Sequence, residues 1–382
     1  MGKINLLYLI TGLRPYGGAE VALANLIPYI DQKKFDIWVG SMHAKEENEI
    51  DIKLPDERIK YFNFSPRYYL DVLGYWKLIS FLKAHSIHIL HTHLFAANTV
   101  GRVSAWLAGV PVTISTEHNT YFTKPASLIF TDKILSNLST RIVAVSDAVL
   151  DHAARQANIA RNRFINIPNC VPIDRIKPLT DSQKIKKLHE LNIAPTRQII
   201  LSVGRLTKQK DFPLLIRAAK LVSTDCPDAI FLIAGKGELE DELQAQIRAA
   251  DLQHHVRLLG YRNDIYDLMQ ISTMLVMSSL WEGLPVTLIE AGACGLPVVS
   301  TNVPGSMEIV QHGVNGLIVP MQDEKALADA IISMLETYDL RHEMGKKARQ
   351  MAESRYSGPA VARKLESMYE ELLASALKTP SK

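Results

Sequence analysis

Ser279-Leu-Trp-Glu-Gly-Leu-Pro-Val-Thr-Leu-Ile-Glu290 is the stretch around which the rest of this chain is organised. An apolar run, Met274–Met277, comes just before it and predicts a buried strand. Glu282 and Gly283 fall in the turn, and Pro285 suits the first position of a helix, where its missing N–H costs nothing. The stretch therefore predicts a strand, a glycine turn and a helix N-terminus.

Such a joint suits an anionic ligand that also carries hydroxyl groups. The first turn of a helix leaves backbone N–H groups without partners, and these groups attract phosphate. Glu290 falls one turn after Val286, so both residues point to the same side of the predicted helix. The carboxylates of Glu282 and Glu290 then flank the anion site. An ordinary strand–helix joint, with a capping Glu282 and a solvated Glu290, fits the local pattern equally well.

The composition is that of a globular protein with two domains. The chain has 382 residues, too many for one ordinary core. Apolar residues make up 47% and charged residues 22%, and the net charge of +3 is too small to indicate a nucleic-acid partner. Three widely spaced cysteines form no CxxC pair, which favours a reducing cytoplasm. Since no apolar stretch approaches ~18 residues, we expect any membrane attachment to be peripheral.

The first half begins with another strand, glycine loop and helix. The apolar run Ile4–Ile10 predicts a buried parallel strand. Gly17 and Gly18 follow it and allow backbone to approach a ligand closely, and a helical pattern starts at Val21. The GxGxxG spacing is absent, which disfavours a nicotinamide oxidoreductase. A plain flexible turn is the alternative reading of this loop.

Two groups of histidines follow predicted strands of the first half. His91-Thr-His93 lies at the end of a strand predicted at Ile87–His91, and His118 follows a strand predicted at Val112–Ser115. The carboxyl ends of parallel strands carry the ligand loops, so both groups are candidates for a site. The His-x-His pair lacks a third metal ligand, and we therefore disfavour metal binding. By pattern alone, a single histidine such as His118 is more often structural.

The segment from Tyr121 to Thr140 approximates an amphipathic helix. Its apolar positions include Leu128, Ile129 and Leu138, with lysines nearby. Such a helix either touches lipid or an acceptor, or packs on its own domain. We favour packing, because any core-facing helix shows this spacing.

The second half repeats the alternation of strands and helices. A strand predicted at Gln198–Leu206 ends in Gly204-Arg205, and Lys210 follows in the next loop. Arg205 and Lys210 are close enough in sequence to converge on one phosphate group, where arginine offers a planar fork and lysine a compact charge. Two solvated loop cations would give the same pattern. A further strand ends in a glycine turn at Gly235.

Glu282-Gly283-Leu284-Pro285, with Glu290 after it, resembles the signature of the retaining glycosyltransferases of family 4, which have the GT-B fold. Other parts of that family's pattern occur in order along the chain: the loop at Gly17-Gly18, His118, Arg205 with Lys210, and Gly235 to Glu238. Many relatives have two glycines where this chain has Pro304-Gly305, which is a difference of loop detail. The resemblance covers nearly the whole chain.

The resemblance implies an α/β fold of two Rossmann-like domains that face each other across a cleft. We expect an acceptor-binding domain at residues 1–174 and a nucleotide-sugar-binding domain at residues 175–355. A C-terminal helix in residues 356–382 is expected to return to the first domain.

The implied reaction moves a hexose or N-acetylhexosamine from a nucleotide-diphosphate sugar to a hydroxyl group, with retention at the anomeric carbon. UDP-sugars are favoured and GDP-mannose is possible. The implied acceptor is a glycan or a lipid-linked glycan of a bacterial envelope, met in the cytoplasm or at the inner face of the membrane. No cofactor is implied. No Asp-x-Asp triplet occurs in the chain, so we expect no metal either.

The resemblance also implies roles for particular residues. Arg205 and Lys210 would bind the diphosphate, Glu290 would accept hydrogen bonds from the ribose, and His118 and Glu282 would lie at the donor sugar. Relatives hold the nucleotide base near the position of Tyr261 and Arg262. The remaining expected donor contacts are the loop and turn residues Gly17, Gly18, Gly204, Gly235, Gly283, Leu284, Pro285 and Val286.

Two other classes of function share the fold and stay open. A nucleotide-sugar epimerase would give an isomer or free nucleotide without an acceptor. A non-catalytic module would bind the sugar nucleotide and leave it intact, although the full set of charged residues argues against it.

Overall fold

The computed structural model describes residues 2–12, 17–42, 60–64, 72–119 and 125–378. The chain divides into two compact units, one of Met1–Cys170 with Gly358–Lys382 and one of Val171–Ser357. These borders differ by a few residues from those expected after residues 174 and 355. Pro15 and Tyr16 of the N-terminal glycine loop and residues 121–124 of the predicted amphipathic helix lie outside the described residues.

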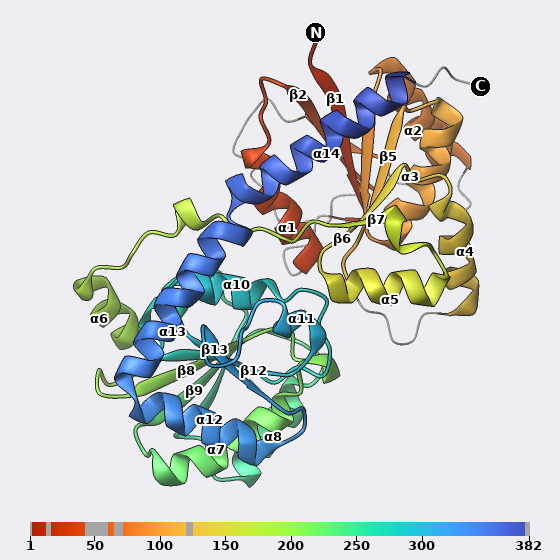
Figure 1. Ribbon diagram of the computed structural model, residues 1–382. Coiled ribbons are helices and arrows are strands. Elements are labelled where there is room, and N and C mark those ends of the chain that lie inside the picture. The colour runs from red at the N-terminus through yellow and green to blue at the C-terminus, as the bar shows by residue number, and fades with distance from the viewer. Residues whose placement is uncertain (1, 13–16, 43–59, 65–71, 120–124, 379–382) are drawn as a thin grey trace. The chain divides into compact units, whose positions relative to one another are not determined.

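The first unit is built on a parallel sheet with strand order β3-β2-β1-β4-β5-β6-β7 (Figure 1). Its strands are β1 (Ile4–Ile10), β2 (Phe35–Ser41), β3 (Lys60–Asn63), β4 (Ile89–His93), β5 (Val112–Glu117), β6 (Arg141–Ala144) and β7 (Phe164–Asn166). Its helices are α1 (Gly18–Leu26), α2 (Val72–Ala84), α3 (Phe95–Ala108), α4 (Ala126–Ser136), α5 (Asp147–Ala157) and α14 (Gly358–Lys378), with short 3-10 turns at Ile27–Tyr29 and Arg161–Arg163.

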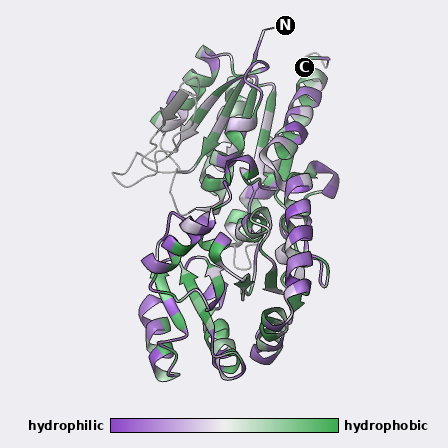
Figure 2. Cartoon of the chain, turned by 90° about the vertical axis from the view of Figure 1, so that its left-hand side faces the viewer, coloured by the Kyte–Doolittle hydropathy of each residue, from purple (hydrophilic) through white to green (hydrophobic). Residues whose placement is uncertain are grey.

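Burial on both faces explains why β1 is a continuous apolar run. Leu6 and Tyr8 pack on one side with residues of α1 and α14, while Leu7 and Leu9 pack on the other with residues of α2 and α3. The C-terminal helix therefore belongs to the core of the first unit. Figure 2 shows the consequence as green strands between helices that carry purple outer faces.

The second unit has a parallel sheet with strand order β10-β9-β8-β11-β12-β13. Its strands are β8 (Gln198–Val203), β9 (Ala229–Ala234), β10 (Val256–Gly260), β11 (Met274–Met277), β12 (Val298–Thr301) and β13 (Gly316–Val319). Its helices are α6 (Asp181–Glu190), α7 (Phe212–Asp225), α8 (Glu240–Ala249), α9 (Ile265–Ile271), α10 (Val286–Ala293), α11 (Pro304–Met307), α12 (Glu324–Glu336) and α13 (Tyr338–Met351). Shorter turns lie at Ile173–Arg175 and Lys208–Lys210, and one π turn lies at Ala352–Tyr356.

Each of the two sheets consists of parallel strands, and helices alternate with strands in both, as in Rossmann-like domains. The order of each sheet reverses beside its first strand, β1 in the first unit and β8 in the second. Ligands of such sheets bind at the carboxyl ends of the strands near this reversal. In the described parts of the chain, no helix is both long enough and apolar enough to cross a membrane.

Two local expectations were wrong in detail. Pro285 is the N-cap of α10, with extended backbone, and the helix begins at Val286. β4 runs from Ile89 to His93 instead of from Ile87 to His91, and the His-x-His pair forms the end of the strand, as expected. The strand starts late because Ile87 still donates its N–H to Leu82 at the end of α2.

The helix predicted at Tyr121–Thr140 is α4; its apolar residues Leu128, Ile129 and Leu135 are partly buried, as expected, but its most buried and most exposed positions differ from the expectation. Its buried positions are the polar residues Asp132 and Ser136, while Phe130 and Ile134 are exposed. Periodicity identified a two-sided helix but did not indicate which side faces the protein.

Candidate active site

The predicted nucleotide loops of the second unit meet at the carboxyl edge of its sheet. The loop after β8 is bonded to the loop after β9, since Leu206 N donates to Lys236 O at 3.0 Å. It is also bonded to the loop after β11, since Leu280 N donates to Gln209 O at 2.8 Å. Backbone hydrogen bonds within the protein therefore hold these loops against one another.

An ion pair lies at the centre of this edge. The Nζ atom of Lys210 is 2.5 Å from Oε1 of Glu282, and both side chains are largely buried. Ser279 donates its hydroxyl to the same oxygen at 2.7 Å, and Gln209 donates to Oε2 at 3.4 Å. Lys210 and Glu282, both predicted to contact the sugar donor, are thus in direct contact with each other. Ser279 and Gln209 hold the Glu282 carboxylate in place.

Close backbone packing explains the glycine at position 235. Gly235 has φ of +154°, and a Cβ atom there would collide with the carbonyl oxygen of Gly204. Gly305 is constrained in the same way, because its Cβ would meet the carbonyl oxygens of Glu282 and Gly283. The Pro304-Gly305 sequence therefore keeps the glycine that packs beneath the Glu282 loop.

The start of α10 lies directly after this loop. Gly283, Leu284 and Pro285 are buried, and the first helical residue is Val286. The N–H groups of the first helical turn have no acceptor within the helix, so this end offers donors and a partial positive charge. It lies beside Lys210 through the contact of that lysine with Glu282.

Glu290 is the second carboxylate of the motif. It accepts a hydrogen bond from the Tyr266 hydroxyl of α9 at 3.2 Å. Burial raises the pKa of Glu290 to about 7, and the Tyr266 hydrogen bond acts in the opposite direction. The side chain therefore changes charge near neutral pH.

The other predicted donor residues of this unit have different surroundings. Arg205 is exposed at the start of its loop, and Tyr261 is half exposed. Arg262 donates to Asp264 at 2.8 Å and to Glu190 at 2.9 Å. Its guanidinium is thus engaged by two carboxylates of its own unit.

In the first unit, His118 lies one residue beyond β5. Its Nε2 is 3.1 Å from Nδ1 of His93, which is the last residue of the neighbouring strand β4. Burial lowers the pKa of His118 to about 4 and that of His93 well below its ordinary value. Both rings are therefore neutral at physiological pH.

His91, the other member of the His-x-His pair, has a structural environment. Its Nδ1 is 2.5 Å from the Tyr369 hydroxyl of α14, and its Nε2 is 2.6 Å from the Thr116 hydroxyl. Tyr369 donates in turn to Tyr8 at 3.1 Å. Among the residues that the structure describes, no group of three or more His, Cys, Asp or Glu side chains could hold a metal ion.

The two N-terminal glycines differ from each other. Gly17 is the N-cap of α1, and a Cβ there would meet the carboxylate of Glu20. Gly18 is exposed and has open space around it. A side chain at position 17 would therefore displace the carboxylate of Glu20, whereas one at position 18 would meet nothing.

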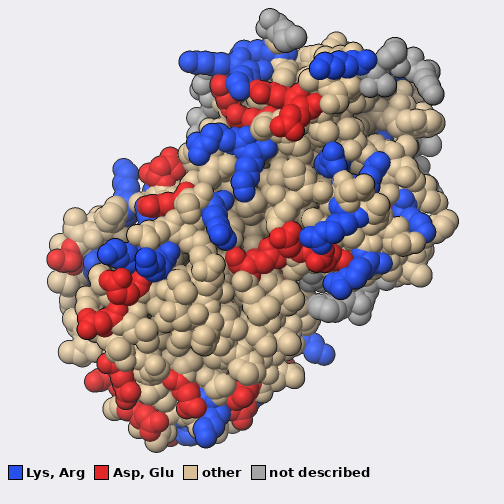
Figure 3. Space-filling model, in the orientation of Figure 1, with Lys and Arg blue, Asp and Glu red and all other residues tan. Residues whose placement is uncertain are grey.

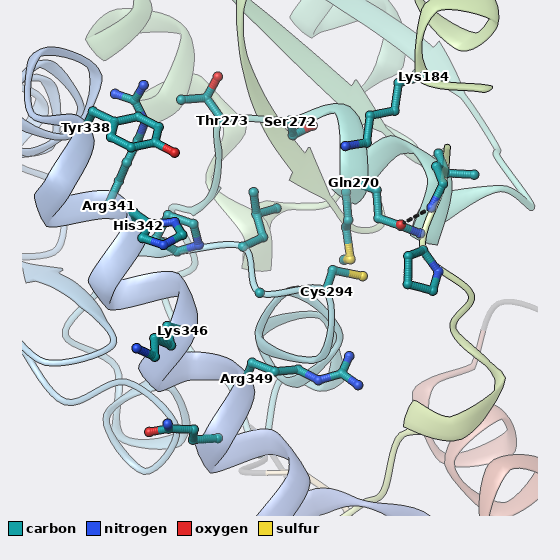
Figure 4. A pocket seen from close by; sticks show the side chains of 17 residues that line it. Lys184, Gln270, Ser272, Thr273, Cys294, Tyr338, Arg341, His342, Lys346 and Arg349 are labelled. Carbon is teal, nitrogen blue, oxygen red and sulfur yellow. Dashed lines mark hydrogen bonds between the residues drawn. The ribbon is translucent and has the colours of Figure 1, made fainter. Parts of the chain in front are cut away.

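A cavity of about 610 Å³ lies at the opposite, amino end of the second sheet, away from the predicted residues (Figure 4). It is lined by Lys184, Arg341, Lys346 and Arg349, among others, and by no carboxylate. Arg341 donates to Met334 O and Leu335 O, and Arg349 donates to Ala293 O. The two arginines therefore cap the C-terminal ends of α12 and α10, and helix ends of this polarity repel anions.

Three residues of the site were not selected from the sequence, and a fourth contact joins two histidine candidates that the sequence did not pair. The three residues are Gln209 and Ser279 on Glu282 and Tyr266 on Glu290, and the fourth contact is that of His93 with His118. Ser279 opens the stretch quoted first and Gln209 is next to Lys210 in the chain, so both are close in sequence to predicted site residues. Tyr266 comes from the neighbouring helix α9, and only the fold shows its contact with Glu290 and that of His93 with His118.

Comparisons with known proteins identify the family of this chain. The family model "Glycosyl transferases group 1" matches residues 183–351, and the model "Glycosyltransferase Family 4" matches residues 16–175. The two matches together take in most of both units. The chain belongs to the group 1, family 4 glycosyltransferases.

Two proteins of similar sequence are named as glycosyltransferases. The chain is 28% identical over 275 residues to an Escherichia coli UDP-Gal:alpha-D-GlcNAc-diphosphoundecaprenol alpha-1,3-galactosyltransferase, covering 70% of this chain and 71% of that one. It is 26% identical over 363 residues to the capsular polysaccharide biosynthesis glycosyltransferase CapM of Staphylococcus aureus, covering 91% and 93%.

Solved structures show the same fold. Anabaena HepE in complex with UDP superposes with a TM-score of 0.83 at 22% identity, covering 96% of this chain and all of that one. A Rickettsia africae glycosyltransferase gives 0.82 at 21% identity, covering 98% and 99%. The expected GT-B architecture is thereby confirmed.

Proposed function

We propose that this glycosyltransferase moves a hexose or N-acetylhexosamine from a UDP-sugar to a hydroxyl group of a glycan or lipid-linked acceptor, with retention and without a metal ion. The observation that carries the proposal is the Lys210–Glu282 pair at the carboxyl edge of the second sheet, beside the start of α10. The pair places a cation that can bind phosphate beside a carboxylate that can accept hydrogen bonds from sugar hydroxyls.

The UDP preference is supported by the relatives. The name of the E. coli relative includes UDP-Gal, and HepE was crystallised with UDP and with UDP-glucose. GDP-mannose remains the alternative donor.

The phosphate contacts follow from charge and position. Lys210 and the exposed Arg205 would bind the two phosphates, together with N–H groups at the start of α10. Glu290, held by Tyr266, would accept from the ribose hydroxyls once it is ionised. Arg262 and Tyr261 would lie near the base, with Arg262 restrained by Asp264 and Glu190.

The reaction breaks the bond between the anomeric carbon and the β-phosphate oxygen, and the electron pair leaves with the diphosphate. The acceptor oxygen bonds to the same carbon from the same face, and its proton passes to the departing diphosphate oxygen. Lys210, Arg205 and the α10 amides would stabilise the charge that develops on the diphosphate. His118 and Glu282 would hydrogen-bond the donor sugar.

A surface on the first unit supports a lipid-linked acceptor. Helices α2, α3 and α4 expose Trp76, Trp106 and Phe130, each more than 60% accessible. Lys77, Lys83 and Lys133 on α2 and α4 are exposed as well. Aromatic rings beside lysines are typical of surfaces that rest on anionic membranes.

Further basic residues lie on neighbouring elements of the first unit. Figure 3 shows several Lys and Arg side chains, with Asp and Glu beside them, over the part of the first unit where α5 and β7 lie in Figure 1. The names of the E. coli relative and of a 27%-identical Campylobacter jejuni relative both include a diphosphoundecaprenol acceptor. We therefore propose peripheral attachment through α2, α3 and α4.

The test is a screen of UDP- and GDP-sugars with EDTA present, scored for nucleotide release with and without polyprenyl-diphosphate-linked glycans. Acceptor-dependent release of UDP, and an α-linked product from an α-linked donor, are expected. Isomerised donor without release would instead identify an epimerase, and binding without any turnover would identify a non-catalytic module.

A further inference from the structure

The strand ends of β4 and β5 hold two histidines in contact. The strands pair with His93 opposite Thr116, and His118, just beyond the end of β5, lies against His93. Nδ1 of His93 and Nε2 of His118 are 3.1 Å apart, and the ring centroids are 5.4 Å apart. One of these two nitrogens must donate its proton to the other.

The remaining nitrogen of each ring has no partner. Within the described part of the chain, His93 Nε2 and His118 Nδ1 are buried and make no hydrogen bond. Buried polar atoms without a partner are costly, so such atoms at a candidate site point to a function. His118 Nδ1 is the ring nitrogen left for a ligand.

Protonation restricts the pair to two arrangements. Burial lowers the pKa of both histidines, so each ring carries one proton at neutral pH. If His93 donates, His118 carries its proton on Nδ1 and can donate it to a ligand oxygen. If His118 donates, its Nδ1 can only accept. The direction of the hydrogen bond between the two rings thus determines whether Nδ1 of His118 is a donor or an acceptor.

We propose that His93 is a positioning residue that donates its Nδ1 proton to His118 Nε2 and thereby keeps His118 as an Nδ1–H donor for the sugar. This inference rests on the proposed function, in which His118 donates to the donor sugar or to its developing charge. His93 is buried, so it acts through His118.

The packing around His93 fits this role. Its ring lies 4.5 Å from the ring of His91 and 5.9 Å from that of Tyr8, measured between centroids. His91 has both nitrogens engaged by Tyr369 and Thr116, so it does not compete for the His93 proton. The neighbours fix the orientation of His93 and leave its Nδ1 to His118.

The direct test is ¹⁵N NMR of the imidazole nitrogens in the full-length protein labelled at histidine, with assignments from His93→Phe and His118→Ala. The wild type should show His118 protonated on Nδ1. His93→Phe keeps an aromatic ring but removes the donor, so His118 should become a mixture of tautomers. His93→Asn, whose amide can donate from the position of Nδ1, should restore the Nδ1–H form. An unchanged His118 tautomer in His93→Phe, or Nε2–H in the wild type, would overturn the inference.

Kinetics separate this inference from the proposed function. With UDP-galactose as probe, His93→Phe should lower kcat about tenfold, as expected for one lost hydrogen bond, and leave UDP affinity unchanged. Adding His93→Phe to His118→Ala should cause no further loss. His85→Phe, at an exposed position of the same unit, is the matched control. Near-normal turnover of His118→Ala would remove the proposed role of His118, whereas a full additional loss in the double variant would overturn only the role of His93.

Discussion

Lys210 and Glu282 are joined by a 2.5 Å ion pair although 72 residues separate them in the chain. A phosphate that binds to Lys210 must compete with this carboxylate or bridge to it. The pair therefore ties donor binding to the position of Glu282, and the two residues are expected to respond differently to substitution.

Lys210→Ala and Arg205→Ala should each weaken UDP binding. A charge-assisted contact to phosphate contributes roughly 1.5–3 kcal/mol, or about 10- to 100-fold in Kd. Titration calorimetry with UDP measures the loss. Lys208→Ala removes an exposed lysine from the same loop and is the control. Equal affinities in all three variants would exclude the proposed diphosphate contacts.

Glu282→Gln should keep or raise UDP affinity and lower turnover at least about tenfold. The amide no longer competes for Lys210 as a charge, but it cannot serve the sugar as a carboxylate. Glu290→Gln should show the reverse pattern, with weaker UDP binding as the main effect. Calorimetry and steady-state kinetics on both variants test the assignment, and an exchange of the two patterns would reverse the roles.

UDP affinity should rise between about pH 6 and pH 8. Burial raises the pKa of Glu290 to about 7, and only the ionised form accepts two ribose hydroxyl protons. Tyr266→Phe removes a hydrogen bond that lowers this pKa, so the rise should move to higher pH. Calorimetry across this range provides the data. A wild-type profile no steeper than that of Glu290→Gln would contradict the coupling.

The same shift affects stability in the opposite direction. The folded-state pKa of about 7 lies above the ordinary value of 4.5, so Glu290 contributes stability that is fully present below about pH 4.5. That contribution is lost as the pH rises through about 7. Thermal denaturation of the wild type and of Glu290→Gln should therefore diverge over this window, and parallel curves would count against the raised pKa.

Tyr369→Phe should destabilise the first unit. Its hydroxyl contacts His91 at 2.5 Å and Tyr8 at 3.1 Å inside the core, so removal leaves buried groups unpaired at a cost of about 1–3 kcal/mol. Urea denaturation measures the effect. Tyr338→Phe, at an exposed tyrosine of α13, should be neutral. A loss of the same size in both variants would show that the buried network is unimportant.

Turnover should survive EDTA. The expectation comes from the missing Asp-x-Asp triplet, with Lys210, Arg205 and helix amides supplying the positive charge. Nucleotide release is measured before and after chelation. Loss of activity that Mg²⁺ or Mn²⁺ restores would show that a metal is needed.

Much of the fold follows from the sequence alone. Ile4–Ile10 and Met274–Met277 are strands at the predicted bounds, because short apolar runs between turn residues have few other structures open to them. Helix α10 begins one residue later than predicted, because Pro285 serves as its cap. The error at β4 arose because apolar residues before the strand extend the same pattern.

The candidate site was less accessible to prediction. Motifs located Lys210, Glu282 and Glu290 by resemblance, but no spacing rule pairs Lys210 with Glu282 across two loops. The contact of His93 with His118 depends on the register of β4 against β5. Which face of α4 is buried depends on the elements that pack against it. The sequence alone therefore did not indicate that Phe130 is exposed.

A crystal structure with UDP tests the central claim most directly. The account predicts the β-phosphate within hydrogen-bond distance of Lys210 Nζ, with the ribose hydroxyls on Glu290. UDP bound away from both residues, for example in the cavity lined by Lys184 and Arg341, would contradict it.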